Sequence, residues 1–183
     1  MAFLRSLSVD AALFEVFRAY PSRAKPLLAF HEALLRGESS LTVAERELIA
    51  AFVSGLNACE YCHGIHGATA EAFGVEEGLL AALLKDVDAS TVDEKMKPIL
   101  RYVRKLTLTP SRMTPADAEA IYAVGWDDSA LHDAVCVCAL FNCMNRMVEG
   151  LGIEPAEGYL KKSGERLKEI GYAGLARMLD DDP

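Results

Sequence analysis

The chain has 183 residues, of which 51% are hydrophobic, and its formal net charge is −8. A chain of this length can bury enough apolar surface to fold without disulfides or a structural metal, so we expect one domain over residues 1–183. The acidic residues are spread along the whole sequence, and an acidic surface repels phosphate backbones, which argues against a nucleic-acid partner.

Helical periodicity runs through the chain, whereas strand signals are almost absent. Thr42 and Glu45 have the spacing of a capping box, Gly74 is a helix stop, Thr114 is an expected N-cap, and Pro98 predicts a kink. The predicted helices cover residues 8–20, 24–35, 43–54, 58–73, 76–85, 92–108, 115–124, 128–149 and 163–179. The sequence therefore predicts an all-α fold.

Two stretches of the sequence are faintly alike. "ERELIAAFVSGLNACEYC" stands before "FGV", and "SALHDAVCVCALFNCMNR" stands before "LGI"; each combines a helix, a polar Asn and a terminal Gly turn. We expect a helical bundle built from two similar helical hairpins, one of which carries the chemistry.

Nothing in the sequence predicts a membrane span or a signal peptide. The longest purely apolar run, Ala134 to Phe141, is far shorter than the roughly 20 residues that cross a bilayer. Asp10 and Glu15 interrupt the N-terminal stretch where a signal peptide stays apolar. Without a secretory signal, the five cysteines are expected to be reduced thiols in a cytoplasmic protein.

The densest group of reactive side chains lies in "NACEYCHGIHG", residues 57 to 67. On a helical wheel Cys59, Cys62 and His66 share one face. Two cysteines three residues apart on a helix lie within the distance that a disulfide spans. Cys59 and Cys62 can therefore form a bond that opens and closes without unfolding the chain.

The residues before this group predict a turn. Gly55 is a poor residue for a helix interior, and Asn57 is a good N-cap for the helix that follows. The positive end of that helix lowers thiol pKa values and favours Cys59, which lies nearer the start. A turn also folds the two helices together and brings Glu47 near the thiols.

The remaining candidates have simpler interpretations. We expect His31, His63 and His132 to be structural or solvated. The other three cysteines are expected to be small buried hydrophobes, and they are Cys136, Cys138 and Cys143. A zinc site is an alternative for the group at 59–66, because two cysteines and a histidine are soft ligands, but a further ligand pair at suitable spacing is lacking.

Glu47, Cys59-x-x-Cys62 and His66 together resemble the E-x11-C-x-x-C-x-x-x-H motif of the alkylhydroperoxidase AhpD-like branch of the carboxymuconolactone decarboxylase superfamily. The later stretch "FNCMNRMVEGLG" is similar to a second signature, that of the peroxidase-related subgroup. The resemblance covers most of residues 40–155, the motif-bearing core.

The resemblance implies an all-helical, oligomeric protein in which Cys62 attacks, Cys59 resolves, and Glu47 with His66 relays protons. Cys62 is then the thiol of lower pKa, against the order expected from the helix dipole. The implied substrates are a small organic hydroperoxide or a protein or lipoyl disulfide, with electrons from an external thiol reductant. No cofactor is expected, since no G-x-G-x-x-G motif is present.

One position departs from the resemblance. The best-known members have His directly before the second Cys, and this chain has Tyr61 there. A phenol does not relay protons at neutral pH as an imidazole does, so the strength of the peroxide chemistry, though not the redox role, is in question. The pocket residues that we expect on this reading are Tyr61, Asn142, Asn145 and Arg146.

Three functions remain open from the sequence. The first is a thiol-dependent peroxidase or disulfide reductase, an alkylhydroperoxidase-like oxidoreductase. The second is a non-enzymatic redox-sensing or zinc-binding helical interaction protein, and the third is a non-redox scaffold. The apolar composition also predicts a homo-oligomer held by apolar helix faces, and burial is expected to raise the pKa of Glu47.

Overall fold

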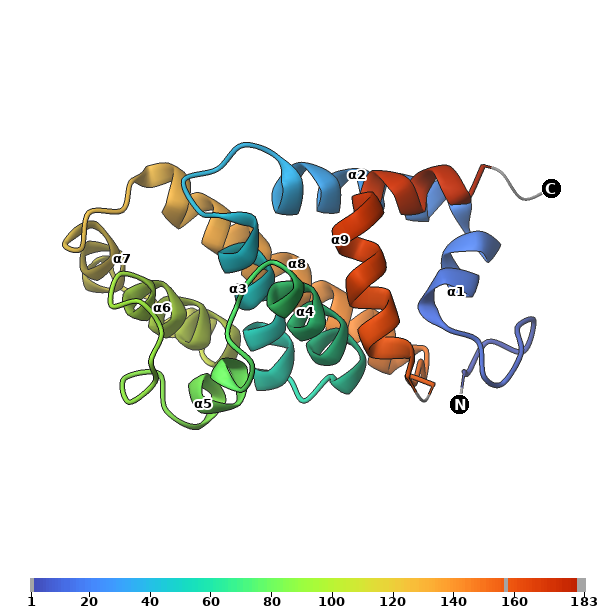
Figure 1. The fold of residues 1–183 in the computed structure, drawn as a ribbon, viewed down its shortest axis with the longest axis horizontal. Coiled ribbons are helices and arrows are strands. Elements are labelled where there is room, and N and C mark those ends of the chain that lie inside the picture. The colour runs from blue at the N-terminus through green and yellow to red at the C-terminus, as the bar shows by residue number, and fades with distance from the viewer. Residues whose placement is uncertain (1, 157, 181–183) are drawn as a thin grey trace.

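The computed structural model describes residues 2–156 and 158–180, and all regular structure within them is helical (Figure 1). The all-α prediction is confirmed. The elements in chain order are α1 (Leu13–Ala19), α2 (Pro21–Arg36), α3 (Val43–Leu56), α4 (Glu60–Ala72), α5 (Leu79–Lys85), α6 (Met96–Leu108), η1 (Pro110–Arg112), α7 (Pro115–Tyr122), α8 (Asp128–Gly150) and α9 (Tyr159–Met178). No helix within these residues is both long and apolar enough to cross a bilayer.

The helix ends with clear sequence signals lie where they were predicted. The Thr42 side chain accepts a hydrogen bond from the Glu45 amide, and the Glu45 carboxylate accepts one from the Thr42 amide, so the capping box forms. At the other end of the α3–α4 unit, Gly74 has a φ of 103°, and the Val75 amide donates to the Ala70 carbonyl. The chain therefore leaves α4 through the left-handed turn that glycine favours.

Several helix boundaries differ from the prediction, among them the start of α9, which lies at Tyr159 and not at residue 163. Helix α6 begins at Met96 and not near residue 92, which places Pro98 in the first turn. A proline there removes no intrahelical hydrogen bond, because the first amides of a helix have no partner, and the kink expected at Pro98 is a helix start. Helix α1 begins at Leu13 and not at Ser8, since residues 5–10 form turns.

The centre of the molecule is the hairpin of α3 and α4 (Figure 1). Helix α8 packs against α3, while α9 packs along both α4 and α2. The approach of α9 to α4 is close: a Cβ atom on Gly164 would lie 2.7 Å from the Cβ of Ala68. The largest fully buried side chains include Phe52 and Phe141, one from each of the helices α3 and α8. The site described next therefore has α9 as one of its walls.

The second of the expected hairpins differs from the first. Asn57 caps the end of α3 and is followed by a turn, whereas Asn145 lies inside α8, which continues without a break. The two similar sequence stretches thus supply a helix pair in one case and a single long helix in the other. Only the α3–α4 stretch presents cysteines at a helix start.

Candidate active site

A tight turn places the cysteine pair. The N-cap of α4 is Cys59, with φ −85° and ψ 94°, and not Asn57 as the sequence suggested. The reason is Ala58, which has a φ of 54°, so the chain needs one left-handed residue to reverse direction after α3. The Cys59 amide donates to the Ser54 carbonyl at 3.0 Å and closes the turn. Cys62 then follows in the first turn of α4.

The two thiols are free and buried, but only one of them faces open space. Cys62 lines a cavity of about 90 Å³, and Cys59 does not. The Cys62 thiol hydrogen-bonds the Cys59 sulfur, which lowers the pKa of Cys59; the same bond, together with burial, raises the pKa of Cys62. The thiol of lower pKa is Cys59, as the helix dipole favoured and contrary to what the resemblance implied.

The cavity lies between α4, α9, α8 and the N-terminal helices. Its walls are mainly apolar, and Cys62 and His66 are among the polar residues that line it. The lining residues are Leu13, Phe14, Phe17, Leu28, His31, Tyr61, Cys62, Ile65, His66, Phe141, Met144, Tyr159, Ser163, Arg166, Leu167, Tyr172 and Leu175.

Glu47 is fully buried behind this cavity and accepts three hydrogen bonds. Its Oε2 accepts from His66 Nδ1 at 2.7 Å, and its Oε1 accepts from Arg36 Nη1 at 2.6 Å and from Tyr172 Oη at 3.0 Å. Burial alone would raise the pKa of this carboxyl, but His66 and Arg36 outweigh burial and hold the pKa below its ordinary value. The expected rise in pKa is therefore wrong, and Glu47 stays ionised.

The ionised Glu47 fixes the state of His66. Since a carboxylate only accepts, His66 Nδ1 carries the proton, and in the neutral ring Nε2 holds a lone pair. Within the described residues Nε2 has no hydrogen-bond partner. The ring is held edge-on by Phe141, with the centroids 4.4 Å apart. His66 is thus a base whose orientation and tautomer are set in advance, one helical turn from Cys62.

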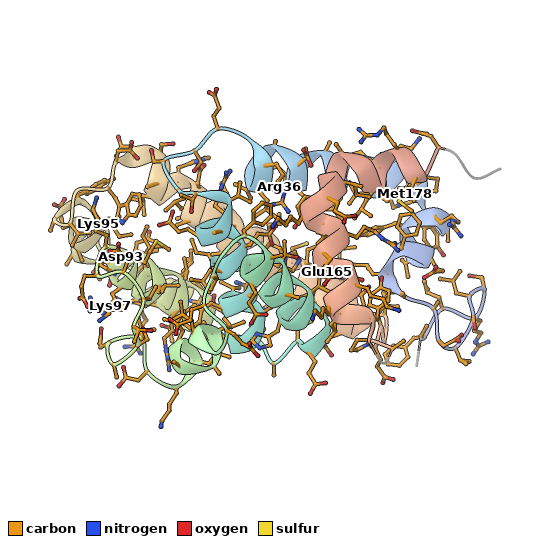
Figure 2. The ribbon with its side chains drawn as sticks, in the orientation of Figure 1. Arg36, Asp93, Lys95, Lys97, Glu165 and Met178 are labelled. Atoms are coloured by element: carbon orange, nitrogen blue, oxygen red, sulfur yellow. The ribbon has the colours of Figure 1, made fainter. Side chains whose placement is uncertain are left out.

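Arg36 was not singled out in the sequence, where it looked like an ordinary basic residue at a helix end. Its guanidinium lies between the rings of Phe73 and Tyr172, 5.1 and 5.0 Å from their centroids, and donates to Glu47 and to the Leu167 carbonyl. Figure 2 labels Arg36 close to the α9 ribbon. This cation balances the charge of the buried carboxylate.

Tyr172 was missed as well, and a break in α9 positions it. Gly171 has φ 62° and ψ −169°, a conformation that side chains other than glycine strongly disfavour, and it kinks the helix. The amides freed by the kink, those of Tyr172 and Ala173, donate to Glu32 Oε2 at 2.8 and 2.9 Å. This arrangement carries the Tyr172 hydroxyl to Glu47.

His31 lines the cavity, although the sequence suggested only a structural role. Its Nδ1 lies 2.8 Å from the Leu27 carbonyl, and its ring contacts Phe141 and Tyr172. Burial lowers the pKa of His31 to about 4, so the ring is neutral at physiological pH. The cavity thus presents two imidazoles, and only that of His66 bonds a carboxylate.

Tyr61, at the position of the departure noted above, lines the cavity as predicted but is tied to the surrounding helices. Its hydroxyl donates to Tyr159 Oη at 3.0 Å and accepts from the Leu13 amide at 3.3 Å. Burial raises the pKa of Tyr61 further above neutrality. Tyr61 therefore links α4 to α1 and α9 and does not replace a proton-relaying imidazole.

The other three predicted pocket residues do not line the cavity, but the side chain of Asn145 hydrogen-bonds the Cys62 thiol, a contact that favours a lower pKa of Cys62. Asn145 is buried, donates to Ser54 Oγ and accepts from Asn57 Nδ2 at 2.9 Å. Asn142 also accepts from Asn57, and Arg146 is exposed and donates back to Asn142. These residues form a polar network between α3 and α8, because the face of α8 that meets the cavity carries Phe141 and Met144 instead.

The remaining cysteines and histidines lie apart from this site. Cys138 is buried as expected, with its Sγ 3.3 Å from Thr107 Oγ1. Cys143 is exposed and Cys136 is half-buried, so the expected burial is wrong for these two. His63 Nδ1 lies 3.1 Å from the Ala51 carbonyl, as expected for a helix-packing residue. Among the described residues, no group of three or more His, Cys, Asp or Glu side chains is arranged to hold a metal ion.

Comparison with known proteins finds similar sequences and similar folds. The sequence model of the carboxymuconolactone decarboxylase family matches residues 21–104. YdfG of Bacillus subtilis strain 168, an uncharacterized protein, is 26% identical over 115 residues, which are 63% of this chain and 78% of that protein. An uncharacterized peroxidase-related protein from Silicibacter sp. TM1040 superimposes with a TM-score of 0.75 and 26% identity, covering 80% of this chain and 77% of that one.

A second solved structure has the same fold. It is described as an alkylhydroperoxidase AhpD core, an uncharacterized peroxidase-related protein from Ralstonia eutropha JMP134. Its TM-score is 0.75 at 24% identity, over 81% of this chain and 78% of that one. These comparisons support a place for the chain in the carboxymuconolactone decarboxylase superfamily, and its fold is that of AhpD-like, peroxidase-related proteins.

The family match contains most, but not all, of the site. Arg36, Glu47, both thiols of the pair and His66 lie within residues 21–104. Tyr172 and the α9 wall of the cavity lie outside the matched residues. The C-terminal helix therefore completes a site whose core the family model covers.

Proposed function

We propose that this protein is a thiol-dependent peroxidase in which Cys59 and Cys62 reduce an organic hydroperoxide. The observation that carries the proposal is the buried chain of contacts from Glu47 to His66, ending at the cavity that Cys62 lines. The cavity supplies an apolar space for an alkyl group, and His66 supplies a base beside the thiol. The kinship with peroxidase-related proteins supports the same assignment.

The reaction uses both thiols and one hydroperoxide. His66 Nε2 takes the proton of Cys62, and the thiolate attacks the outer peroxide oxygen, breaking the O–O bond. This step gives a Cys62 sulfenic acid and an alcohol once the alkoxide is protonated. The Cys59 thiol then attacks Cys62 Sγ, which forms the disulfide and releases water. An external dithiol restores both cysteines by thiol–disulfide exchange.

The division of roles between the cysteines follows from access and not from pKa. Only Cys62 meets the cavity, so it is the thiol that a bound hydroperoxide can reach. The lower pKa of Cys59 suits the second step, because the resolving thiol must attack as a thiolate. A partner disulfide could be reduced through the same two thiols.

A thiol titration tests the proposal. The reduced protein is mixed with one equivalent of tert-butyl hydroperoxide, free thiols are counted over time, and dithiothreitol is then added. The proposal predicts rapid loss of two thiols per chain, release of one equivalent of tert-butanol, and full recovery of both thiols. Retention of all five thiols under these conditions would show that the site has no peroxidase activity.

A further inference from the structure

The charge of the cavity lining is opposite to that of the chain. The protein has 27 acidic and 19 basic residues, yet no aspartate or glutamate is found among the described residues that line the cavity. Of the described residues, Arg166 on α9 is the one Lys or Arg in that lining. Glu47 lies behind His66, and Arg36 balances its charge. The carboxylate next to Cys59 is that of Glu149, which is exposed and is not among the residues that line the cavity. The cavity is therefore a site for a neutral or anionic ligand.

Arg166 is available to a ligand. The residue is exposed, and its guanidinium makes no hydrogen bond or ion pair with any described residue. Tyr159, Ser163 and Arg166 follow each other at intervals of four and three residues, so they share the face of α9 that lines the cavity. An arginine on such a wall offers a planar fork that matches a carboxylate.

The size of the cavity limits the rest of the ligand. Its volume of about 90 Å³ is smaller than the roughly 150 Å³ of an engineered cavity that holds benzene. Its apolar walls are aliphatic and aromatic side chains such as Leu28, Ile65 and Phe141. A short aliphatic group fits this space better than an aromatic ring does.

We propose that the substrate is a short aliphatic hydroperoxide that carries a carboxylate, with the peroxide at Cys62 and the carboxylate at Arg166. The inference rests on the proposed peroxidase function and adds a substrate class to it. Arg166 is then a specificity residue, which touches the far end of the substrate and takes no part in the transfer of electrons.

A binding experiment separates this inference from the chemistry. The reduced protein is titrated with 4-methylpentanoate and with 4-methylpentanamide, an unreactive pair that differs in charge, and binding is followed by calorimetry. The variants are Arg166→Gln and, as a matched control, Lys162→Gln. Lys162 is an exposed cation on the same helix that does not line the cavity, so both variants change the net charge equally.

The acid should bind about tenfold more tightly than the amide to wild type and to Lys162→Gln, the scale of one hydrogen bond to a charged group. In Arg166→Gln this preference should fall to about 1. A preference that survives in Arg166→Gln, or that disappears equally in Lys162→Gln, would overturn the assignment of Arg166. Equal binding of acid and amide to wild type would overturn it as well.

A kinetic experiment then links binding to turnover. The second-order rate of thiol oxidation is measured with 4-hydroperoxy-4-methylpentanoate and with its amide, and the acid is expected to react about tenfold faster in wild type. If tert-butyl hydroperoxide oxidises the thiols but acid and amide react equally, the substrate class is wrong and the peroxidase stands. If the acid binds through Arg166 but no hydroperoxide reacts, the anion site stands and the peroxidase proposal fails.

Discussion

Two cysteine–histidine pairs lie four residues apart on helices of this protein, Cys62 with His66 on α4 and His132 with Cys136 on α8. The second pair is in contact, with Cys136 Sγ 3.6 Å from His132 Nε2. The His132 side chain is 73% exposed, whereas that of His66 is 9% exposed. The same spacing on two helices thus gives one pair whose histidine is exposed to solvent and one pair whose histidine is buried.

The carboxylates beside the two histidines differ in the same way. Glu47 Oε2 lies 2.7 Å from His66 Nδ1 and is fully buried, while Asp133 Oδ1 lies 3.3 Å from His132 Nδ1 on a neighbouring residue. The α4 pair also has a second thiol and a cavity, and Cys136 has neither. The spacing of a cysteine and a histidine is therefore not enough to predict a reactive site. Burial, a fixed histidine tautomer and a second thiol distinguish the α4 pair from the α8 pair.

The largest expected effect on activity is the loss of the Cys62 thiol, compared with the loss of the Cys136 thiol. Replacing Cys62 by serine should lower hydroperoxide consumption in the presence of dithiothreitol by about 10³-fold or more, because the nucleophile is lost. The matched variant Cys136→Ser should keep the wild-type rate within about twofold. Turnover assays with tert-butyl hydroperoxide measure both. If Cys136→Ser consumed hydroperoxide as slowly as Cys62→Ser, the reactive cysteine would lie on α8 and not on α4.

The next effect concerns pH and His31, which lies inside the site. Burial lowers the pKa of His31 to about 4 from the ordinary value of 6.5, so between these values the unfolded chain binds more protons than the folded one. Stability should therefore fall as the pH falls from 6.5 to 4, by about 3 kcal/mol in all.

Urea unfolding at several pH values measures this loss, with His31→Asn as the comparison. The variant should be less dependent on pH over that window, whatever its absolute stability. Glu47, whose pKa is lowered from 4.5, contributes in the same direction only as the pH falls below that value. An unchanged slope between pH 6.5 and 4 in the His31 variant would show that His31 is not buried as a neutral ring.

Glu47→Gln should slow thiol oxidation by about 10²-fold, the usual scale for impairing a general base. The amide no longer stabilises a protonated His66, so His66 becomes a weaker base for Cys62. Part of the rate should return at high pH, where the thiol ionises unaided. The measurement is the rate of thiol oxidation against pH, with circular dichroism to confirm folding.

The matched control for this variant is Asp133→Asn beside the exposed pair, which should keep the wild-type rate and pH profile. If Glu47→Gln and wild type gave identical profiles, Glu47 would be a structural residue only. The positioning of His66 would then have to come from Phe141 and the cavity walls alone.

Tyr172→Phe should have the smallest effect. The variant loses one buried hydrogen bond to Glu47, which should lower the free energy of unfolding by about 1 kcal/mol and thiol oxidation by a few fold. Its control is Tyr122→Phe, whose hydroxyl bonds Asp128 at the surface and should cost less than about 0.5 kcal/mol. Equal losses in the two variants would show that Tyr172 has no special role at Glu47.

The sequence predicted the features that depend on residues close together along the chain. The capping box of Thr42 and Glu45, the Gly74 stop and the shared face of Cys62 and His66 all follow from residues within a few positions of each other. The meeting of Glu47 and His66 was predictable too, because the turn between the two adjacent helices lets them fold back on each other. The positions of these residues match the structure, while their chemical roles stay predictions.

The parts that were missed depend on long separations or on helix rotation. Tyr172 meets Glu47 from 125 positions away, through a kink that one glycine permits. Arg36 looked like a typical last-turn cation, and only packing turned it toward the carboxylate. On α8 a rotation of about 100° per residue decides between a polar network at Asn142 and Asn145 and a cavity wall at Phe141, and sequence spacing alone does not fix that rotation.

The most direct test of the proposed cysteine chemistry is a mass-spectrometric map of the disulfides before and after one equivalent of tert-butyl hydroperoxide. We expect Cys59 and Cys62 to become linked within the same chain. The other cysteines should remain reduced, and they are Cys136, Cys138 and Cys143. A map in which Cys136 or Cys143 is the main oxidised residue would contradict it, because the chemistry would then lie on the exposed face of α8.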